Sequence, residues 1–292
     1  MTTKFSTNSS NQKVAVVTGG SSGIGYETSL TLARNGFVTY ATMRNLRKSD
    51  TIKSLAAKEP SLSHFLRVVQ LDVTDENSIS KAVQSIESEA GRIDVLVNNA
   101  GYGLTGPFEE LALDEIKAQY DTNFYGVVRV TQAVLPAMRK QRSGRIINIS
   151  SGAGRFGYPG GSAYVSSKFA LEGLSESMTF ELEQFGIRVV LIEPGFIRTN
   201  FGNDIVFAKK AQNPNSPYSQ MMQAISSTFS KLAENASPPE LVANAVLEAA
   251  TSNNPKLRYL VGKDIEQWVA AKRSMSDEEF YAMMKQVEEK VS

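Results

Sequence analysis

The residues best suited to chemistry in this sequence are a tyrosine and a lysine, Tyr164 and Lys168, which lie four positions apart. At that spacing both side chains share one face of a helix. A phenol has a pKa of about 10 and is a poor acid–base catalyst at neutral pH, but an ammonium group one turn away favours the phenolate. The pair therefore predicts an acid–base unit, although a surface pair without a chemical role would have the same spacing.

A glycine-rich stretch, Val14 to Gly25 (VAVVTGGSSGIG), offers a second kind of chemistry. Its first four residues favour a buried strand, its glycines (Gly19, Gly23 and Gly25) allow a tight turn, and the residues that follow have helical character. A strand that leads through such a turn into a helix presents backbone N–H groups to a pyrophosphate. The stretch predicts a phosphate site, and a purely structural turn is the alternative.

The end of the next predicted strand, Phe37–Thr42, is where a dinucleotide-binding fold contacts the adenosine ribose. An acid there would bind the 2′-hydroxyl of NAD(H), but the chain has Met43 and Arg44. A guanidinium suits a 2′-phosphate, and Ser22 of the glycine-rich turn could add a hydroxyl. We predict NADP(H) as the cofactor in preference to NAD(H), with an exposed loop arginine as the alternative interpretation of Arg44.

Polar and small residues follow two further predicted strands. Asp72 comes after Arg67–Leu71, where its carboxylate could accept a hydrogen bond from an adenine amine or, alternatively, cap a helix. Asn98-Asn99-Ala100-Gly101 follows Ile93–Val97 and leaves room for a ribose and a nicotinamide. Asn123 lies within an apolar, mostly helical segment, where a buried amide, a kink or a functional role are all open.

These segments belong to a repeating strand–helix pattern, which predicts one α/β domain with a parallel sheet covered by helices on both faces. We expect a single-domain Rossmann fold over residues 13–292 with a doubly wound, seven-stranded sheet. Residues 1–12 are interpreted as a flexible tail. Residues 200–235 interrupt the pattern and are interpreted as a helical lid over the substrate, with an ordinary packed helical pair as the alternative. Residues 265–292 form a charged, helical C-terminal extension.

Composition excludes several classes of function. The chain has 292 residues, with 31 Lys and Arg against 30 Asp and Glu, a net charge of +1 that gives no footprint for nucleic acid. It has no cysteine and a single histidine, His64, so we expect no disulfide, no thiol chemistry and no metal site. No apolar run is long enough to span a membrane, and residues 1–11 lack the apolar core of a secretory signal. We therefore expect a soluble, cytoplasmic protein.

Four motifs, in order and at matching spacing, give the chain its resemblance to the classical short-chain dehydrogenase/reductase family over residues 13–261. They are Thr18-Gly19-Gly20-Ser21-Ser22-Gly23-Ile24-Gly25, Asn98-Asn99-Ala100-Gly101, Tyr164-x-x-x-Lys168, and Pro194-Gly195 with Thr199. The resemblance implies reversible hydride transfer between nicotinamide and a carbonyl or alcohol carbon. It also implies the catalytic tetrad Asn123, Ser151, Tyr164 and Lys168.

In this tetrad, the resemblance makes Tyr164 the general acid in reduction and the base in oxidation, while Ser151 donates to the carbonyl oxygen. Lys168 lowers the tyrosine pKa and holds the nicotinamide ribose, and Asn123 holds a water for proton relay. The residues implied for cofactor binding are Gly19, Ser21, Ser22, Gly23, Ile24, Gly25, Arg44, Asp72, Val73, Asn99, Ala100, Gly101, Tyr164, Lys168, Pro194, Gly195, Ile197 and Thr199.

Within the family, the segments 40–46 and 255–259 are similar to the branch of 17β-hydroxysteroid dehydrogenase type 1 and retinol dehydrogenases. That branch prefers NADP(H) and acts on hydrophobic ketones and alcohols, which is the substrate class the resemblance implies. A histidine often contacts the substrate there, and this chain has none beyond His64. The resemblance also implies a homodimer or homotetramer. A non-catalytic NADP-binding sensor or scaffold with the same fold is the alternative function.

Overall fold

A seven-stranded, wholly parallel sheet forms the centre of the computed structural model, which describes residues 12–199 and 205–289. The tail expected at 1–12 therefore lies almost entirely outside the described residues, as does the start of the expected lid, 200–204. From one edge to the other the strands are β3 (Leu66–Gln70), β2 (Val38–Met43), β1 (Val14–Val17), β4 (Val95–Asn98), β6 (Gly144–Ile149), β7 (Ile187–Pro194) and β9 (Arg258–Val261). The predicted doubly wound sheet is confirmed.

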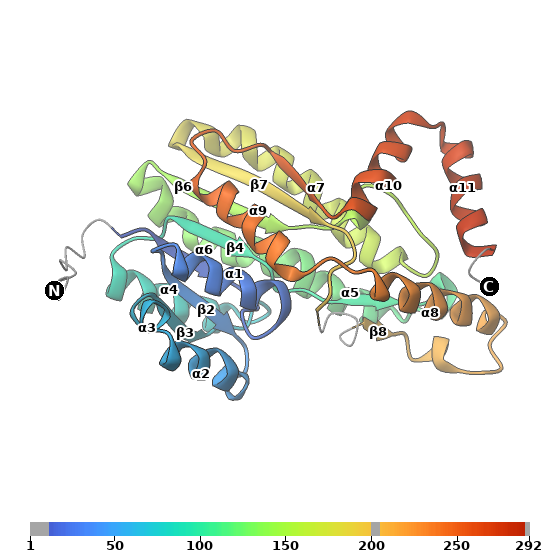
Figure 1. The fold of residues 1–292 in the computed structure, drawn as a ribbon, viewed down its shortest axis with the longest axis horizontal. Coiled ribbons are helices and arrows are strands. Elements are labelled where there is room, and N and C mark those ends of the chain that lie inside the picture. The colour runs from blue at the N-terminus through green and yellow to red at the C-terminus, as the bar shows by residue number, and fades with distance from the viewer. Residues whose placement is uncertain (1–11, 200–204, 290–292) are drawn as a thin grey trace.

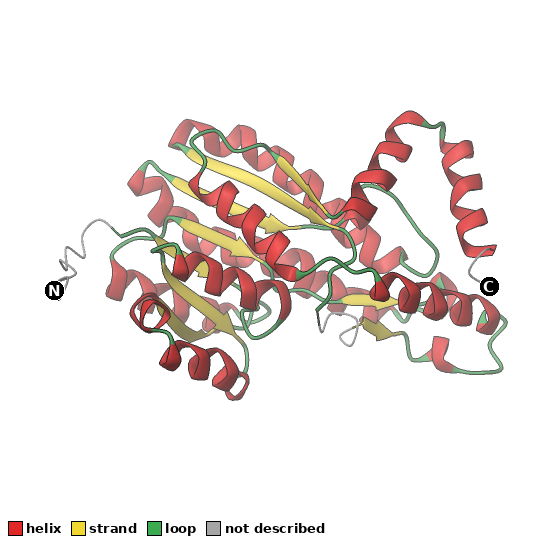
Figure 2. Ribbon diagram, viewed as in Figure 1, coloured by secondary structure: helices red, strands yellow, loops and turns green. Residues whose placement is uncertain are grey.

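Helices cover both faces of this sheet (Figures 1 and 2). One face packs against α4 (Glu76–Ala90), α6 (Gly126–Gln141) and α7 (Ser162–Leu182). The other packs against α1 (Gly23–Arg34) and α9 (Pro239–Thr251), with α2 (Asp50–Lys58) and α3 (Pro60–Phe65) beyond α1 near the β3 edge.

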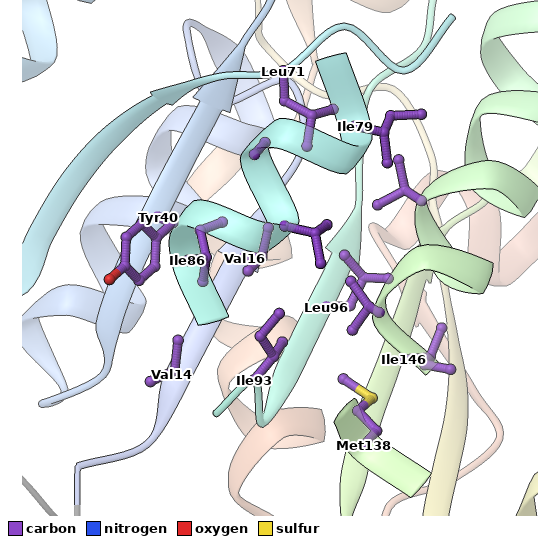
Figure 3. Close-up of a cluster of buried hydrophobic side chains, with 14 of the residues drawn as sticks. Val14, Val16, Tyr40, Leu71, Ile79, Ile86, Ile93, Leu96, Met138 and Ile146 are labelled. Atoms are coloured by element: carbon purple, nitrogen blue, oxygen red, sulfur yellow. The ribbon is translucent and has the colours of Figure 1, made fainter. Parts of the chain in front are cut away.

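The central strands β1 and β4 are almost wholly apolar because both of their faces are buried. In β1, Val14 and Val16 join the cluster under α4 and α6, whereas Ala15 and Val17 join the cluster under α1 and α9. Figure 3 shows the first cluster, to which Leu96 of β4 and Ile86 of α4 also belong. This alternation fixes the register of β1, since a slip of one residue would exchange the two faces.

The direction of winding reverses between β1 and β4, which are neighbours in the sheet although β2 and β3 separate them in the sequence. In open α/β sheets a crevice forms at such a point, beyond the carboxyl ends of the strands. The glycine-rich turn leaves β1 here, and Asn99 follows β4 here. The topology therefore brings together two of the sequence motifs.

Two features near this edge differ from the predicted elements. The helical segment expected around Asn123 is divided into α5 (Leu113–Tyr120), a π-helical turn (Asp121–Tyr125) and α6, so that Asn123 lies in a local irregularity. A separate parallel pair, β5 (Gly103–Thr105) with β8 (Ile205–Phe207), was not predicted. Strands of three residues carry too little periodicity to be recognised.

The remaining helices lie beyond the carboxyl ends of the strands. They are α8 (Ser219–Glu234), which follows β8, and α10 (Lys263–Ser274) and α11 (Asp277–Glu289), which follow β9. In Figure 1 the last two form a hairpin that projects from the body of the molecule, with α11 close to one end of α8. The helical character expected for the C-terminal extension is found.

Candidate active site

A cavity of about 840 Å³ lies at the carboxyl ends of the parallel strands. It is lined by residues that follow β1, β2, β3, β4, β6 and β7 and by residues of α7. Of the residues singled out in the sequence for catalysis or cofactor binding, all line this cavity except Gly25 and Asn123. The fold thus gathers motifs from most of the chain around one space.

The glycine-rich turn shapes the part of the cavity next to β1. Gly19 and Gly23 have positive φ angles of 70° and 56°, which L-residues with side chains rarely adopt. Gly25 lies beneath the turn: a Cβ atom there would overlap the carbonyl oxygen of Gly19 and the amide nitrogen of Asn99. Ser22, Gly23 and Ile24 line the cavity at the start of α1, whose first turn has no acidic residue. This end of the helix suits a phosphate.

Thr18 joins the turn to the segment that follows β4. Its hydroxyl accepts hydrogen bonds from the backbone N–H groups of Asn99 and Ala100, at 2.9 and 3.0 Å. The Asn99 side chain donates back to the carbonyl oxygens of Thr18 and Gly19, at 2.9 and 3.3 Å. Thr18 was not singled out as a site residue, although its place in the Thr-Gly motif was a usable signal. These four bonds hold two walls of the cavity at a fixed separation.

The end of the cavity near β2 is positively charged. Arg44 lines it, and no carboxylate occurs at the neighbouring positions Met43 and Asn45. Lys48, in the 3-10 turn Leu46–Ser49, also lines the cavity, although it belongs to none of the sequence motifs. Gln70 at the end of β3 donates to the Arg44 carbonyl at 3.1 Å and ties the two strand ends together.

Asp72 stabilises a local turn and lies on the cavity wall, and it does not cap α4. One of its carboxylate oxygens accepts hydrogen bonds from the backbone N–H and the hydroxyl of Thr74, at 3.0 and 2.7 Å, so it stabilises the local turn. It also lines the cavity, as does the neighbouring Val73. Asp75, and not Asp72, caps α4 through the backbone N–H groups of Asn77 and Ser78.

Ser151, Tyr164 and Lys168 meet at the end of β6. The ammonium of Lys168 donates to the carbonyl oxygen of Ile149 at 2.8 Å and lies 5.6 Å from the centre of the Tyr164 ring. Tyr164 has a side-chain hydrogen bond with Ser151. The Ser151 hydroxyl also accepts from the backbone N–H of Ala153 at 3.1 Å, which fixes its position. A hydroxyl, a phenol and an ammonium group therefore share one corner of the cavity.

Burial dominates the ionisation of this corner. It raises the pKa of Tyr164 to about 12, against a smaller lowering by the hydrogen bond with Ser151. It also lowers the pKa of Lys168 to about 8, against a raising effect of Glu172. The lowered tyrosine pKa expected from the lysine is not found, because the buried phenolate loses more solvation than its neighbours return. The Tyr164 phenol is therefore protonated at neutral pH.

Asn123 does not line the cavity. Its side-chain oxygen accepts from the backbone N–H of Tyr102 at 3.1 Å, and its amide donates to the Tyr102 carbonyl at 2.9 Å and to the Ser167 hydroxyl at 3.5 Å. The amide therefore fixes the segment that follows Gly101 against the helix carrying Tyr164. The proposed water relay at Asn123 remains a prediction.

A buried ionic network lies next to Lys168. The Nε atom of Arg258 is 3.0 Å from carboxylate oxygens of both Glu172 and Glu193, and Arg155 is 3.0 Å from Glu193. Burial raises the pKa of Glu172 to about 6, with a further raising effect of Glu193 and opposing effects of Ser150 and Arg258. Sequence reasoning missed this network. The place of Glu172 four residues after Lys168 was the available signal.

The segment expected to form the lid contributes little to the cavity wall. Val206 and Lys209 line the cavity, but Met222 and Ile225 of α8 are buried in a separate cluster with Leu104 and Ala163. Phe201 lies outside the described residues. Most of the apolar side chains of α8 that suggested a lid are used to pack this helix against the body, which is the alternative considered for the segment.

The described part of the chain contains no group of three or more His, Cys, Asp or Glu side chains that could hold a metal ion. None of its helices is both long enough and apolar enough to cross a membrane.

Comparison with known proteins agrees with these motifs. The family described as short chain dehydrogenase matches residues 13–210. The uncharacterized oxidoreductase YusZ of Bacillus subtilis is 41% identical over 88% of this chain and 91% of its own length. Human retinol dehydrogenase 8 is 37% identical (84% of this chain, 80% of that protein), and human 17-beta-hydroxysteroid dehydrogenase type 1 is 36% identical (84% and 76%). The resemblance to this branch is confirmed.

Solved structures give the same result. A short-chain dehydrogenase from Streptomyces avermitilis superposes with a TM-score of 0.78 at 32% identity, covering 95% of this chain and 96% of that one. A metagenomic short-chain oxidoreductase in complex with NADP gives 0.67 at 28% identity (87% and 97%). One from Burkholderia phymatum in complex with NAD gives 0.76 at 23% identity (90% and 93%) and shows the fold alone. The sheet order, the cavity and these relatives lead to one conclusion: this chain belongs to the short-chain dehydrogenase/reductase family of oxidoreductases.

Proposed function

We propose that the protein is an NADP(H)-dependent oxidoreductase that reduces a carbonyl group, or oxidises the corresponding alcohol, of a hydrophobic small molecule. The observation that carries the proposal is that Ser151, Tyr164 and Lys168 lie in the same cavity as the glycine-rich turn. A proton donor and a phosphate cradle in one space suit hydride transfer, in which a dinucleotide and a carbonyl must meet.

The cradle fits a dinucleotide. Gly25 has no room for a side chain, Gly19 and Gly23 have positive φ angles, and the uncapped start of α1 opens on the cavity. We assign the pyrophosphate to residues 19–24, the adenine to Asp72 and Val73, and the nicotinamide half to the segments 99–101 and 194–199. When bound, the dinucleotide supplies the hydride at the C4 atom of the nicotinamide.

Preference for NADP(H) rests on charge. Arg44 and Lys48 are two cations on the cavity wall at the end of β2, and no acid lies beside Arg44 in the sequence. A 2′-phosphate would form charge-assisted hydrogen bonds with such groups, whereas the 2′-hydroxyl of NAD(H) would leave the cations without a partner. NAD(H) is the weaker alternative.

The acid–base roles follow from the ionisation of the corner. With its pKa raised to about 12, Tyr164 is protonated at neutral pH and can give its proton to the carbonyl oxygen during reduction. Ser151, already hydrogen-bonded to Tyr164, donates to the same oxygen as negative charge develops on it. Lys168 holds the ribose of the nicotinamide half. Asn123 holds the water for proton relay.

The substrate is proposed to be hydrophobic. Leu104, Ala118 and Val206 contribute apolar surface to the cavity, and no histidine lines it. Proteins named for retinol and for a steroid are among the relatives of this chain, which agrees with a large apolar ketone or alcohol.

We include a homodimer or homotetramer in this proposal. Phe169 and Phe180 of α7 are exposed, as are Tyr125 of the π-helical turn and Leu113 of α5. Large apolar side chains gathered on neighbouring helices are typical of subunit interfaces. Size-exclusion chromatography with light scattering measures the mass directly.

The central test follows NADPH consumption at 340 nm with a panel of apolar ketones and aldehydes, for the natural protein and for Tyr164→Phe. We expect turnover in the natural protein and a loss in the variant on the order of 10²- to 10⁴-fold, because general acid–base catalysis contributes about that much. NADPH binding, measured by its fluorescence, should be unchanged. Binding without turnover on any substrate would favour a sensor, and near-natural turnover of Tyr164→Phe would contradict the assignment.

A further inference from the structure

The C-terminal hairpin of α10 and α11 touches the loops on both sides of the cavity corner. One loop follows β6 and carries Ser151, and the other follows β7 and carries Gly195. Although the hairpin projects from the body in Figure 1, the beginning of α10 lies where these strands end. No residue of α10 or α11 lines the cavity. Any effect of the hairpin on the site must therefore pass through the two loops.

The contact with the second loop is made by Asp264. Its Oδ2 atom accepts a hydrogen bond from the backbone N–H of Phe196 at 2.8 Å. A Cβ atom at Gly195 would overlap this carboxylate, and one at Gly262 would lie 2.5 Å from Oδ1, so the side chain fills the space between two glycine backbones. Gly262, the residue before α10, has a φ of 120°, which only glycine adopts readily. The carboxylate is thus held in place by backbone on two sides.

Gly195 lines the cavity next to Pro194 and Ile197, in the segment we assign to the nicotinamide half of the cofactor. Its backbone N–H donates to the carbonyl of Val261 at 2.9 Å, which extends the β7–β9 pairing by one residue. Beyond Gly195 the chain leaves the sheet, and Asp264 takes the next N–H group. The hydrogen bond from Phe196 therefore sets the path of the loop at its first residue outside the sheet.

The contact with the first loop is made by Ile265 and Trp268. Ile265 is buried and packs against Gly152, directly after Ser151, so closely that a Cβ atom at Gly152 would overlap it. The Trp268 ring stacks on Phe156 with centroids 5.8 Å apart and an angle of 16°. Phe156 lies between Ser151 and Tyr164 in the sequence, so both contacts support the loop that joins them.

We propose that α10 is a positioning element of the active site, in which Asp264 sets the cofactor loop and Ile265 sets the Ser151 loop. This inference rests on the proposed function of the cavity. Neither residue touches substrate or cofactor; each acts through the backbone of a loop that does. Displacements of about 1 Å in such loops are enough to lower rates strongly, because hydride and proton transfer depend on alignment.

Substitutions of Asp264 and Ile265 should affect different constants, the dissociation constant of NADPH and kcat respectively. Asp264→Ala should raise the dissociation constant of NADPH by about fivefold or more, since a hydrogen bond to a charged acceptor is lost beneath the cofactor loop. Asp264→Asn retains an oxygen that can accept from Phe196 and should restore binding to within about threefold of the natural protein. Ile265→Ala should lower kcat by about tenfold with little change in NADPH affinity, because its effect reaches Ser151 and not the cofactor loop.

A matched control lies in the same hairpin. Asp277→Asn removes a carboxylate that pairs with Lys272 on the surface of the hairpin, at a side chain that is 87% exposed, and it should change neither constant. Trp268 is the single tryptophan of the chain, so its fluorescence reports the packing of the hairpin on the Phe156 loop in each variant. Circular dichroism and thermal unfolding identify any general loss of structure.

The experiment measures NADPH binding by titration, kcat and KM at saturating NADPH, and tryptophan emission for all four variants of the full chain. Separate effects on NADPH affinity and on kcat, in folded variants, support the proposal. If Asp264→Ala and Ile265→Ala leave both constants within twofold, or if Asp264→Asn weakens binding as much as Asp264→Ala does, the proposal is overturned. If the natural protein binds NADPH but reduces no substrate of the panel, the proposed function fails, while the NADPH titrations still test the role of Asp264.

Discussion

The nucleotide side of the cavity and its substrate side differ in the groups that form their walls. On the nucleotide side the walls are backbone: glycines without room for a side chain, the start of α1, and four hydrogen bonds that join Thr18 and Gly19 to Asn99 and Ala100. On the substrate side the walls come from short segments far apart in the sequence, among them β5 and β8.

This difference has a physical reason. The cofactor is charged and constant, so it is bound by N–H groups and cations whose positions the sheet fixes. The substrate side is held by contacts outside the sheet, such as the bond from the Tyr218 hydroxyl to Glu109 at 2.6 Å and the bond from the Lys209 backbone N–H to Glu115 of α5 at 3.0 Å. The first region should tolerate few substitutions, and the second should tolerate many.

The largest effect is expected at the centre of the nucleotide side. Gly25→Val would place a branched side chain against the Gly19 carbonyl and the Asn99 amide, neither of which can move without breaking the turn. NADPH affinity, measured by fluorescence titration, should fall on the order of 100-fold, since the overlap is with backbone. Gly173→Ala, in α7 where a Cβ atom meets nothing within 4 Å, is the matched control. Unchanged affinity of Gly25→Val would show that the turn is more adaptable than we infer.

The next effect separates the two cofactors. Arg44→Asp replaces a cation on the cavity wall by an acid that can accept from a ribose hydroxyl and repels a 2′-phosphate. The ratio of kcat/KM for NADPH to that for NADH should fall by about tenfold or more, given about 1.5–3 kcal/mol for a hydrogen bond to a charged group. Lys48→Ala should lower the same ratio by less. A ratio that does not move in either variant would remove Arg44 and Lys48 from the 2′-phosphate site.

A third prediction concerns the buried carboxylate near Lys168. Because the pKa of Glu172 is raised from 4.5 to about 6, the folded protein binds a proton between these values that the unfolded chain has released. Its contribution to stability is present below pH 4.5 and is lost as the pH rises through 6. Glu172→Gln lacks this titration. The difference between the free energies of unfolding of the variant and the natural protein should therefore shift by about 2 kcal/mol in favour of the variant as the pH rises from 4.5 to 7.

Urea unfolding of both proteins across this pH range measures that change. Glu176→Gln is the control, because it removes a half-exposed partner of the same Arg258. Its free energy of unfolding at a single pH gives the stability that is lost with one contact to the guanidinium. A stability difference between Glu172→Gln and the natural protein that stays constant with pH would mean that Glu172 is not protonated in the folded state near pH 6.

The smallest effect is expected at the margin of the substrate side. Tyr218→Phe removes the hydroxyl that bonds to Glu109 at an exposed contact, where water can replace the lost partner. The KM for the best ketone of the screen should change by less than about threefold, with NADPH affinity unchanged. A large change in KM would mean that this contact governs access to the cavity, and the contrast between the two regions would then be weaker than described.

Most of the fold followed from local patterns. Apolar strands such as β1, each followed by a helix, predict a parallel sheet because both faces must be buried. The glycine-rich turn, Asn99 and Ser151 follow predicted strands, and the rule that ligands bind beyond the carboxyl ends of parallel strands predicts that they share one site. The irregular elements did not follow: three-residue strands and the π-helical turn at Asn123 carry no periodic signal.

The sequence by itself determined the family, the parallel sheet of alternating strands and helices, and most of the chemical groups around the cavity, because these depend on spacing along the chain and on the period of apolar residues. Tertiary structure alone decided how these groups ionise and what supports them. Burial sets the pKa of Tyr164 above its ordinary value although the lysine is present, since desolvation depends on the surrounding volume and not on neighbours in sequence. The contact of Asp264 with Phe196 joins residues 68 positions apart, and no local pattern records it.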